Sequence, residues 1–265
     1  MKNLLFSSQA ATCINTREFY KPNEDYYIND VKNGVFIVAD GVTRNHEEYI
    51  DTKESAAEKV SHIFAETVHE NILKNCFENL TDTEILDLLF LCVKEGNKKI
   101  KEYNSAKTLE YWEYYPATVG IVAIILNNKL YYVYSGDCLG FLFRNNTRLL
   151  FAEQQTKHLN FYKKQLTKKE RYENNCNNKD SRLAYGVFNG EDAALDLVKS
   201  SYIDLNSGDT IVISSDGLEN YFLLENPNDI IGLTSEEIFE KSKIYDRKPY
   251  SPYADDKTFI MISVK

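Results

Sequence analysis

The sequence has little glycine or proline and no long hydrophobic run. Only 11 of its 265 residues are Gly and 5 are Pro, and neither type gathers into a break between domains. No segment approaches the roughly 20 consecutive apolar residues of a membrane helix, and the apolar run at the N-terminus is shorter than that of a signal peptide. We therefore expect a single domain over residues 1–265, in the cytoplasm and without membrane contact.

Cysteine is also sparse, and acidic residues outnumber basic ones. The 5 Cys residues are scattered and form no CxxC pair, so neither a zinc finger nor a framework of disulfides is expected. The net charge of -9 disfavours binding of nucleic acid across the whole surface, but it is compatible with bound metal cations. With 43% hydrophobic residues, a chain of this length has enough apolar material for a sizeable core.

Several segments are rich in the β-branched and aromatic residues of buried strands. They are 35–39, 118–126, 129–134, 139–144, 147–151, 210–214 and 258–264. Asn127-Asn128 and Asn145-Asn146 each connect two of these segments, and Asn tolerates the positive φ of a tight hairpin turn. Hairpins favour antiparallel sheets over a doubly wound parallel sheet.

Two segments between the first two strands have the apolar spacing of helices, residues 52 to about 74 and 82 to about 103. Asp51 with Glu54, and Thr81 with Glu84, are candidate capping boxes. On the first helix His62, Glu66 and His69 share one face at a spacing that metal ligands also use. That face lies opposite the apolar stripe, so a solvated surface is the simpler interpretation. The elements together predict an α+β domain.

Acidic residues stand where the expected strands begin or end. They are Glu24 and Asp25 ahead of the first strand, Asp40, Asp137 and Asp216 after three apolar strands, and Asp255 and Asp256 before the last strand. Carboxylates gathered at one edge of a sheet repel one another unless a cation neutralises them, and carboxylates with water suit Mg²⁺ or Mn²⁺. Two interpretations remain open, a shared metal site and a set of independent turn aspartates.

Five blocks resemble, in order and type, the motifs of the type 2C metal-dependent protein phosphatases, the PPM family. They are Asn23-Glu24-Asp25, VFIVADG at 35–41, YSGD at 134–137, VISSDGL at 212–218 and ADDKT at 254–258. The resemblance implies a bacterial-type, stand-alone catalytic domain. It also implies a four-layer α/β/β/α sandwich, in which two packed antiparallel sheets are flanked by helix pairs.

The resemblance also implies roles for individual residues. Asp40 would bridge two Mn²⁺ or Mg²⁺ ions, and the carbonyl of Gly41 would bind one of them. Asp216 and Asp255 would ligate the other ion.

Three further acidic residues would contribute less directly to metal binding. Glu24 and Asp25 would act mainly through metal-bound water, and Asp137 matches a residue associated with a possible third ion. The implied reaction is hydrolysis of phosphoserine and phosphothreonine in protein substrates by a metal-activated water, without a covalent phosphoenzyme.

The chain departs from the family at the residues that handle the substrate phosphate. Tyr20 stands where the family usually has Arg, so Lys21 and Arg44 are the candidates to hold the phosphate, and Arg17 is a weaker one. The family's general-acid His is missing, and His46 is a poor substitute. These departures favour an alternative, a non-catalytic phosphatase-like binding or regulatory module, whereas the retained carboxylates argue against it. A third possibility is a metal-dependent phosphohydrolase for small molecules.

A basic segment falls where the family carries a variable flap, at about 154–183. From Lys157 to Arg182 it has 8 basic and 3 acidic residues, within a chain whose net charge is -9. Two interpretations are open: a basic lip that attracts phosphorylated or acidic protein, or a solvated loop.

Overall fold

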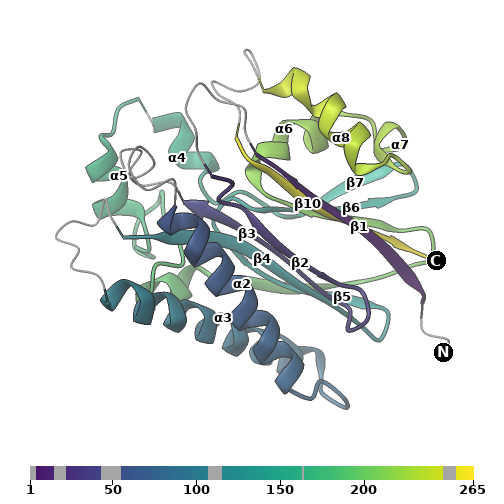
Figure 1. Cartoon of the computed structure of the whole chain (residues 1–265), viewed down its shortest axis with the longest axis horizontal. Coiled ribbons are helices and arrows are strands. Elements are labelled where there is room, and N and C mark those ends of the chain that lie inside the picture. Colours follow the sequence, from purple (N-terminus) through teal and green to yellow (C-terminus); the bar gives the residue numbers. More distant parts are fainter. Residues whose placement is uncertain (1–3, 15–21, 43–54, 107–114, 163, 247–254) are drawn as a thin grey trace.

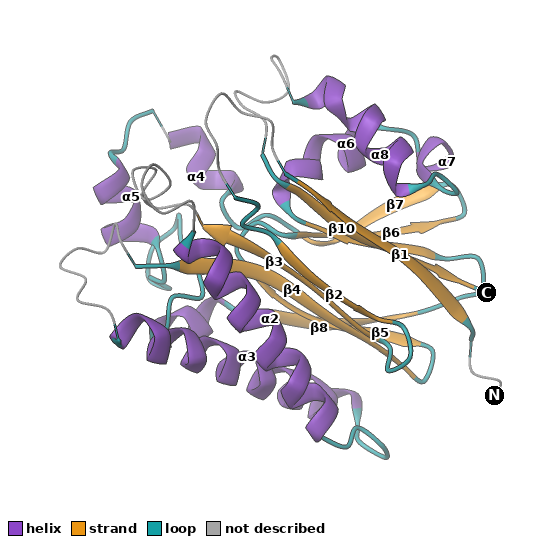
Figure 2. Ribbon diagram, viewed as in Figure 1, coloured by secondary structure: helices purple, strands orange, loops and turns teal. Residues whose placement is uncertain are grey.

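Two antiparallel sheets packed face to face form the centre of the molecule. The computed structural model describes residues 4–14, 22–42, 55–106, 115–162, 164–246 and 255–265. Within these residues each sheet has 5 strands, and helices cover both outer faces (Figures 1 and 2). The predicted four-layer sandwich is confirmed. In the described part of the chain, no helix is long and apolar enough to cross a membrane.

One sheet contains the strand that carries Asp40. In spatial order its strands are β2 (Tyr26–Asp30), β3 (Val35–Val42), β4 (Ala117–Leu126), β5 (Lys129–Ser135) and β8 (Lys199–Asp204). The β4–β5 turn is made by Asn127 and Asn128, with positive φ values of 51° and 61°, as expected from the residue type. The sequence did not predict β2 and β8, because both are edge strands whose sequences, YYIND and KSSYID, lack a long apolar run.

The other sheet contains the strands next to Asp216 and Asp255. In spatial order they are β1 (Phe6–Cys13), β10 (Lys257–Val264), β9 (Thr210–Ser214), β6 (Leu139–Arg144) and β7 (Thr147–Ala152). Asn145 and Asn146 turn the β6–β7 hairpin, again at positive φ. β1 is an edge strand with a partly polar sequence, and it was not predicted. The inner faces of the two sheets share one apolar core.

Helices α2 (Ala56–Lys74) and α3 (Asp82–Ser105) cover the outer face of the first sheet. Their apolar faces pack on β3, β4 and β5. Thr81 and Glu84 form the predicted capping box of α3. The expected cap of α2 was wrong, because Ser55 is its N-cap and accepts from the main-chain N–H groups of Ala57 and Glu58. Asp51 and Glu54 lie outside the described residues.

The polar face of α2 contacts the first sheet rather than solvent alone. His62 stacks on Tyr26 with ring centroids 3.8 Å apart. His69 Nε2 lies 2.9 Å from a carboxylate oxygen of Asp30, and the hydroxyl of Tyr26 donates to Glu66 at 3.3 Å. These side chains therefore fasten α2 to the edge strand β2. The sequence suggested a solvated face because β2 itself was not predicted.

Among the described residues, three short helices cover the second sheet: α6 (Glu219–Leu224), α7 (Pro227–Ile230) and α8 (Ser235–Ser242). The 3-10 turns η3 (Asp216–Leu218) and η4 (Lys243–Tyr245) flank this group. Its apolar residues pack on Phe141 and Phe259. The expected layer is present, although it is built from short helices rather than a long pair. Helices this short show too little periodicity for a sequence to reveal them.

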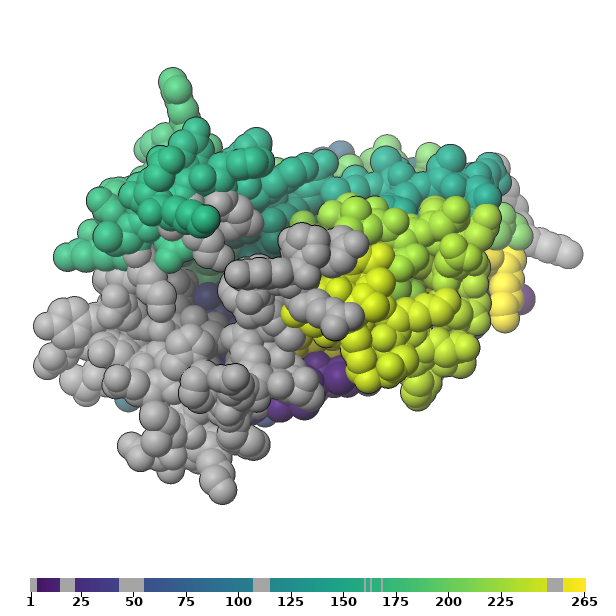
Figure 3. All heavy atoms as spheres, turned by 90° about the horizontal axis from the view of Figure 1, so that it is seen from above, coloured from purple at the N-terminus to yellow at the C-terminus, as the bar shows by residue number. Residues whose placement is uncertain are grey.

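The segment predicted as a flap, about 154–183, lies between β7 and β8. It contains α4 (Lys157–Tyr162) and α5 (Lys168–Asn175), and the turn η2 (Asp192–Leu197) follows it. Figure 1 places α4 and α6 at the end of the sandwich where β10 begins. Seen from above, the segment with α4 and α5 lies at the upper left and the C-terminal helices lie at the right (Figure 3).

Candidate metal centre

The register of the strands brings the acidic turns to one end of the sandwich. In the second sheet Ser214 pairs with Leu139 on one side and with Phe259 on the other. Three segments therefore lie side by side at this end of the sheet: the turn after β9, the turn before β6 and the entry of β10. They carry Asp216, Asp137 and Asp255. In the first sheet the end of β3 pairs with the start of β4, which leaves Asp40 at the same end.

The electrostatics of these carboxylates indicates that they lie close enough to influence one another. Burial raises the pKa of Asp40 well above its usual value, and the charges of Asp25, Asp216, Asp137 and Asp255 raise it further. The two sheets therefore bring these groups within electrostatic reach of one another, which favours a shared site over independent turn aspartates.

Two further members of the cluster respond in the same way. Burial raises the pKa of Asp216 well above its usual value, followed by the charges of Asp137 and Asp255. Burial and the charge of Asp256 raise the pKa of Asp25 to about 7. Each group is therefore held in a field that favours its protonated form unless a cation balances the charge.

The chemistry of this donor set fits a hard divalent cation. It offers carboxylate oxygens and main-chain carbonyls. Among the described residues, no three His, Cys, Asp or Glu side chains form a ready metal-binding cluster. Mg²⁺ keeps several waters and takes only one or two carboxylates, and Mn²⁺ suits the same ligands, so an open acidic site fits these ions better than Zn²⁺.

Glu24 is fully buried, and three segments hold its main chain and side chain. The hydroxyl of Ser55 donates to Glu24 Oε1, and the Glu24 N–H donates to Asp256 Oδ2 at 3.1 Å. The Glu24 carbonyl accepts from Gly41 N at 3.1 Å and from Ser61 Oγ at 2.7 Å. This residue therefore links β3, the start of α2 and the entry of β10.

Ser215 is a buried residue of the site that sequence reasoning missed. Its hydroxyl donates to Asp25 Oδ2 at 2.7 Å and accepts from Thr258 N at 3.0 Å. The Ser215 N–H donates to the Thr258 carbonyl at 3.0 Å. Its position directly before Asp216 was the only signal in the sequence, and a serine there has no special meaning without the pairing to β10.

Gly217 permits close contact between η3 and the entry of β10. A Cβ at Gly217 would lie 2.0 Å from the carbonyl oxygen of Asp256. At Gly41 a Cβ would lie 2.7 Å from the carbonyl oxygen of Glu24 and 2.9 Å from that of Ala57. Only glycine fits where main chains approach this closely. Both glycines therefore set the spacing between the segments that carry the carboxylates.

Glu219 is a second missed member, on the first turn of α6. Burial raises its pKa, the charge of Asp137 raises it further, and Lys157 of the flap lowers it. Gln154 Nε2 donates to Glu219 Oε2 at 3.5 Å. The acidic cluster therefore extends toward the flap.

Cys138 follows Asp137 and is fully buried. Burial and the charge of Asp40 raise the pKa of its thiol well above the usual value. All 5 cysteines are free.

The expected phosphate-binding residues cannot be placed. Lys21 and Arg44 lie outside the described residues, as do Arg17, Tyr20 and His46. Both candidates therefore remain predictions.

Comparison with known proteins finds likeness in structure alone. No protein-family model matches the sequence, and no curated protein matches it. The catalytic domain of the serine/threonine phosphatase PstP in complex with 2 manganese ions aligns with a TM-score of 0.66 and 17% identity over 99% of each chain.

Other solved structures are similar too, including the following two. The serine/threonine phosphatase of S. agalactiae has a TM-score of 0.67 and 19% identity over 98% of this chain and 100% of its own. Stp1 from Staphylococcus aureus has a TM-score of 0.64 and 14% identity over 98% of this chain and 95% of its own. At these identities the likeness establishes the fold, and the chain has the two-sheet fold of these serine/threonine phosphatases.

Proposed function

We propose that the chain is a Mg²⁺- or Mn²⁺-dependent protein serine/threonine phosphatase that hydrolyses phosphomonoesters. The observation that carries the proposal is the cluster of partly buried, mutually repelling carboxylates drawn from both sheets. The fold shared with serine/threonine phosphatases, one of them in complex with manganese, supports it.

The cluster argues for a catalyst rather than a scaffold. Burying like charges together opposes folding, and a binding module gains nothing from it. Strongly shifted carboxylates gather where chemistry or metal binding uses them. The alternative is a non-catalytic phosphatase-like module. It would carry the unfavourable repulsion between these carboxylates without any function that requires it.

The residues would divide between two ions, with a possible third. Asp40 would be shared by both ions, because charged residues from both sheets act on its carboxylate. The carbonyl of Gly41 would join one ion, and Asp216 and Asp255 the other.

Glu24 and Asp25 would act through water, and Asp137 would serve the third ion. When bound, the divalent ions would lower the pKa of a coordinated water and offset charge on the phosphoryl oxygens.

The chain itself preorganises these groups. Thr118 Oγ1 donates to the main-chain carbonyl of Asp40 at 2.8 Å, which fixes the end of β3. Ser215 orients Asp25, and the contact at Gly217 sets the position of Asp216 relative to β10. Side chains held this way need little rearrangement when a charged substrate arrives.

The proposed substrates are proteins that carry phosphoserine or phosphothreonine. Lys21 and Arg44 are the candidates to hold the phosphate. Lysine would supply a point charge, whereas arginine could form a two-pronged contact.

The test is hydrolysis of p-nitrophenyl phosphate and of phosphopeptides by the purified chain. We expect turnover with Mn²⁺ or Mg²⁺, loss of turnover in EDTA and recovery with excess Mn²⁺. Calorimetric titration with Mn²⁺ separates the alternatives. Metal binding without hydrolysis would favour the non-catalytic module, and hydrolysis of small esters but not of phosphopeptides would favour a small-molecule phosphohydrolase.

A further inference from the structure

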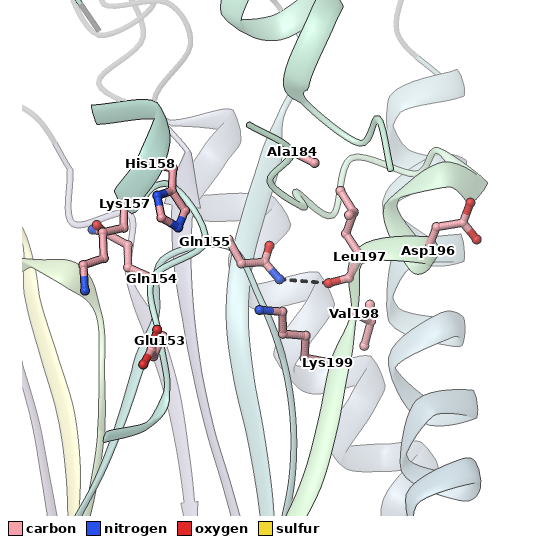
Figure 4. A pocket seen from close by; sticks show the side chains of 10 residues that line it. All are labelled: Glu153, Gln154, Gln155, Lys157, His158, Ala184, Asp196, Leu197, Val198 and Lys199. Carbon is pink, nitrogen blue, oxygen red and sulfur yellow. Dashed lines mark hydrogen bonds between the residues drawn. The ribbon is translucent and has the colours of Figure 1, made fainter. Parts of the chain in front are cut away.

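A pocket of about 280 Å³ is lined by residues of the segment that contains α4 and by the start of β8 (Figure 4). Its walls come from the segment after β7 and the start of α4, from Ala184, and from the end of η2 and the start of β8. The side chains that matter here are Glu153, Gln154, Gln155, Lys157, His158 and Lys199. The volume is at the lower end for ligand sites, and it suits one side chain or a small anion.

Two glutamines join this pocket to the proposed metal centre. Gln154 lines the pocket and donates to Glu219, whose pKa responds to Asp137. Gln155 Oε1 accepts from Gly136 N at 3.0 Å, directly before Asp137. The same side chain donates to the carbonyl of Leu197, a pocket residue, at 2.8 Å. The wall of the pocket is therefore also the support of the Asp137 turn.

The pocket contains lysines as well as acids, unlike the carboxylate cluster. Lys157 and Lys199 line it, with His158 beside them. Of its two acidic residues, Asp196 is paired with Lys179 at 2.9 Å, and Figure 4 shows it turned away from the other lining side chains. Lys157 also acts on the charge of Glu219 in the acidic cluster, and the described residues show no ion pair for Glu153. Lys199 is therefore the cation most available to an anion in this pocket.

We propose that this pocket binds an acidic side chain of the substrate, close in sequence to the phosphorylated residue. The proposal rests on the phosphatase function proposed above. An extended peptide advances about 3.3 Å per residue, so a phosphorylated Ser or Thr at the carboxylate cluster would bring a residue within about three positions to the flap side. The structure thus assigns a preference for phosphopeptides with a nearby Asp or Glu.

The experiment uses pairs of phosphopeptides that differ by Glu against Gln at one position, from three before to three after the phosphorylated residue. Each pair changes charge with little change of shape. We expect kcat/KM to be about fivefold higher for Glu at one or more positions, as for a partly exposed charge pair. The ratio should fall toward one as salt is raised, because the Debye length is about 10 Å at 0.1 M.

Variants test whether the pocket causes the preference. Lys199→Gln should bring the Glu/Gln ratio close to one, and Lys199→Glu should make the Gln peptide the better substrate. Lys157→Gln should also lower the ratio. Lys32→Gln is the matched control, since it removes the same charge from an exposed turn at the other end of β3 and should keep the wild-type ratio. Mn²⁺ titration and the thermal midpoint monitor the fold of each variant.

The outcomes separate the two proposals. If no phosphopeptide and no p-nitrophenyl phosphate is hydrolysed with Mn²⁺, the phosphatase function fails. If peptides are hydrolysed with a ratio of one at every position, or with a ratio that survives both lysine variants, only the pocket assignment is overturned. Inorganic phosphate is the other anion of suitable size. Phosphate inhibition that weakens in Lys199→Gln, without any Glu preference in the wild type, would assign the pocket to free phosphate and would also overturn the side-chain proposal.

Discussion

The carboxylate of Asp40 interacts electrostatically with acidic residues from both sheets. Burial and the charges of Asp25 and Asp216 raise its pKa, so its ionised form needs a cation. We expect Asp40→Asn to reduce Mn²⁺-dependent turnover by at least about 10²- to 10³-fold, because a group that stabilises the reaction by charge is lost. The fold should be kept, since the change is nearly isosteric and removes repulsion.

The measurement for Asp40→Asn is kcat with p-nitrophenyl phosphate, together with Mn²⁺ titration by calorimetry. Asp87→Asn is the matched control, because Asp87 is exposed on α3 and undergoes the same chemical change. Wild-type turnover in Asp40→Asn would refute the bridging role.

Ser215 supports the site through hydrogen bonds that are fully buried. Ser215→Ala leaves Asp25 without this donor and Thr258 N without this acceptor. We expect the free energy of unfolding to fall by about 1–3 kcal/mol. Mn²⁺ affinity should fall about 10- to 100-fold, as when other residues that orient metal ligands are lost.

The neighbouring Ser214 provides the control for this experiment. It is also buried, yet its hydroxyl finds no hydrogen-bond partner in the described structure. Ser214→Ala should therefore leave both urea stability and Mn²⁺ affinity nearly unchanged, or raise the stability. Equal effects of the two substitutions would contradict the role given to Ser215.

The sequence predicted those site residues whose role can be inferred from their place next to an apolar strand. Asp40, Asp137 and Asp216 each follow an apolar strand, and their convergence could be anticipated. Ser215 and Glu219 could not, because their roles arise from the pairing of β9 with β10 and from the packing of α6 near Asp137. The phosphate-binding cation is a different case, since Lys21 and Arg44 remain predictions.

At the scale of elements, the contact between η3 and the entry of β10 sets the spacing of Asp216 and Asp255. Gly217→Ala would place a methyl group 2.0 Å from the main-chain oxygen of Asp256. The two segments would have to separate, so we expect a loss of about 1–3 kcal/mol in the free energy of unfolding and a clear loss of Mn²⁺ affinity.

Gly208→Ala is the control that tests whether the effect of Gly217→Ala comes from the contact between η3 and the entry of β10. Gly208 has a φ of +92°, and an added Cβ would meet nothing within 4 Å. The substitution should therefore lower stability through backbone strain alone, by about 1–2 kcal/mol. Urea unfolding should thus report similar losses for the two variants, whereas Mn²⁺ titration should report a change only for Gly217→Ala. Unchanged Mn²⁺ affinity in Gly217→Ala would contradict the proposed spacing role.

Elements were predictable where a continuous pattern exists within the element itself. The apolar strands, the two long helices and the paired asparagines at positive φ belong to this class. β1, β2 and β8 are edge strands that become strands by pairing with a neighbour. For the same reason the face with His62 and His69 was read as solvated, although β2 covers it.

At the scale of the whole molecule, the carboxylates connect two independently paired sheets. Asp40 belongs to the first sheet, Asp216 and Asp255 flank the second, and Asp137 lies on the connection between them. The four-layer arrangement was expected from the resemblance, because hairpins and helices alone do not fix how sheets stack. Repulsion in the cluster opposes the sandwich when no cation is present, and this effect depends on pH.

Asp25, Asp40 and Asp216 all have a pKa in the folded state above the usual value of Asp. The folded chain therefore retains protons that the unfolded chain has already released. The three groups add their full contribution to the free energy of unfolding below about pH 4, where they are protonated in both states. This contribution is lost as pH rises. For Asp25 the loss spans about pH 4 to its folded pKa of about 7, and for Asp40 and Asp216 it continues higher. Each group contributes at most about 1.4 kcal/mol per pH unit.

We therefore expect wild-type protein in EDTA to lose stability from pH 5 to pH 8 relative to Asp40→Asn, which lacks one of these groups. In saturating Mn²⁺ the trend should reverse, because metal binding displaces protons and strengthens as pH rises. Bound metal adds about 2.7 kcal/mol at 100 times its Kd. Urea unfolding of both proteins across this range, with Asp87→Asn as the control, measures the difference. A metal-free wild type that follows Asp40→Asn at every pH would mean that the carboxylates do not repel one another across the two sheets.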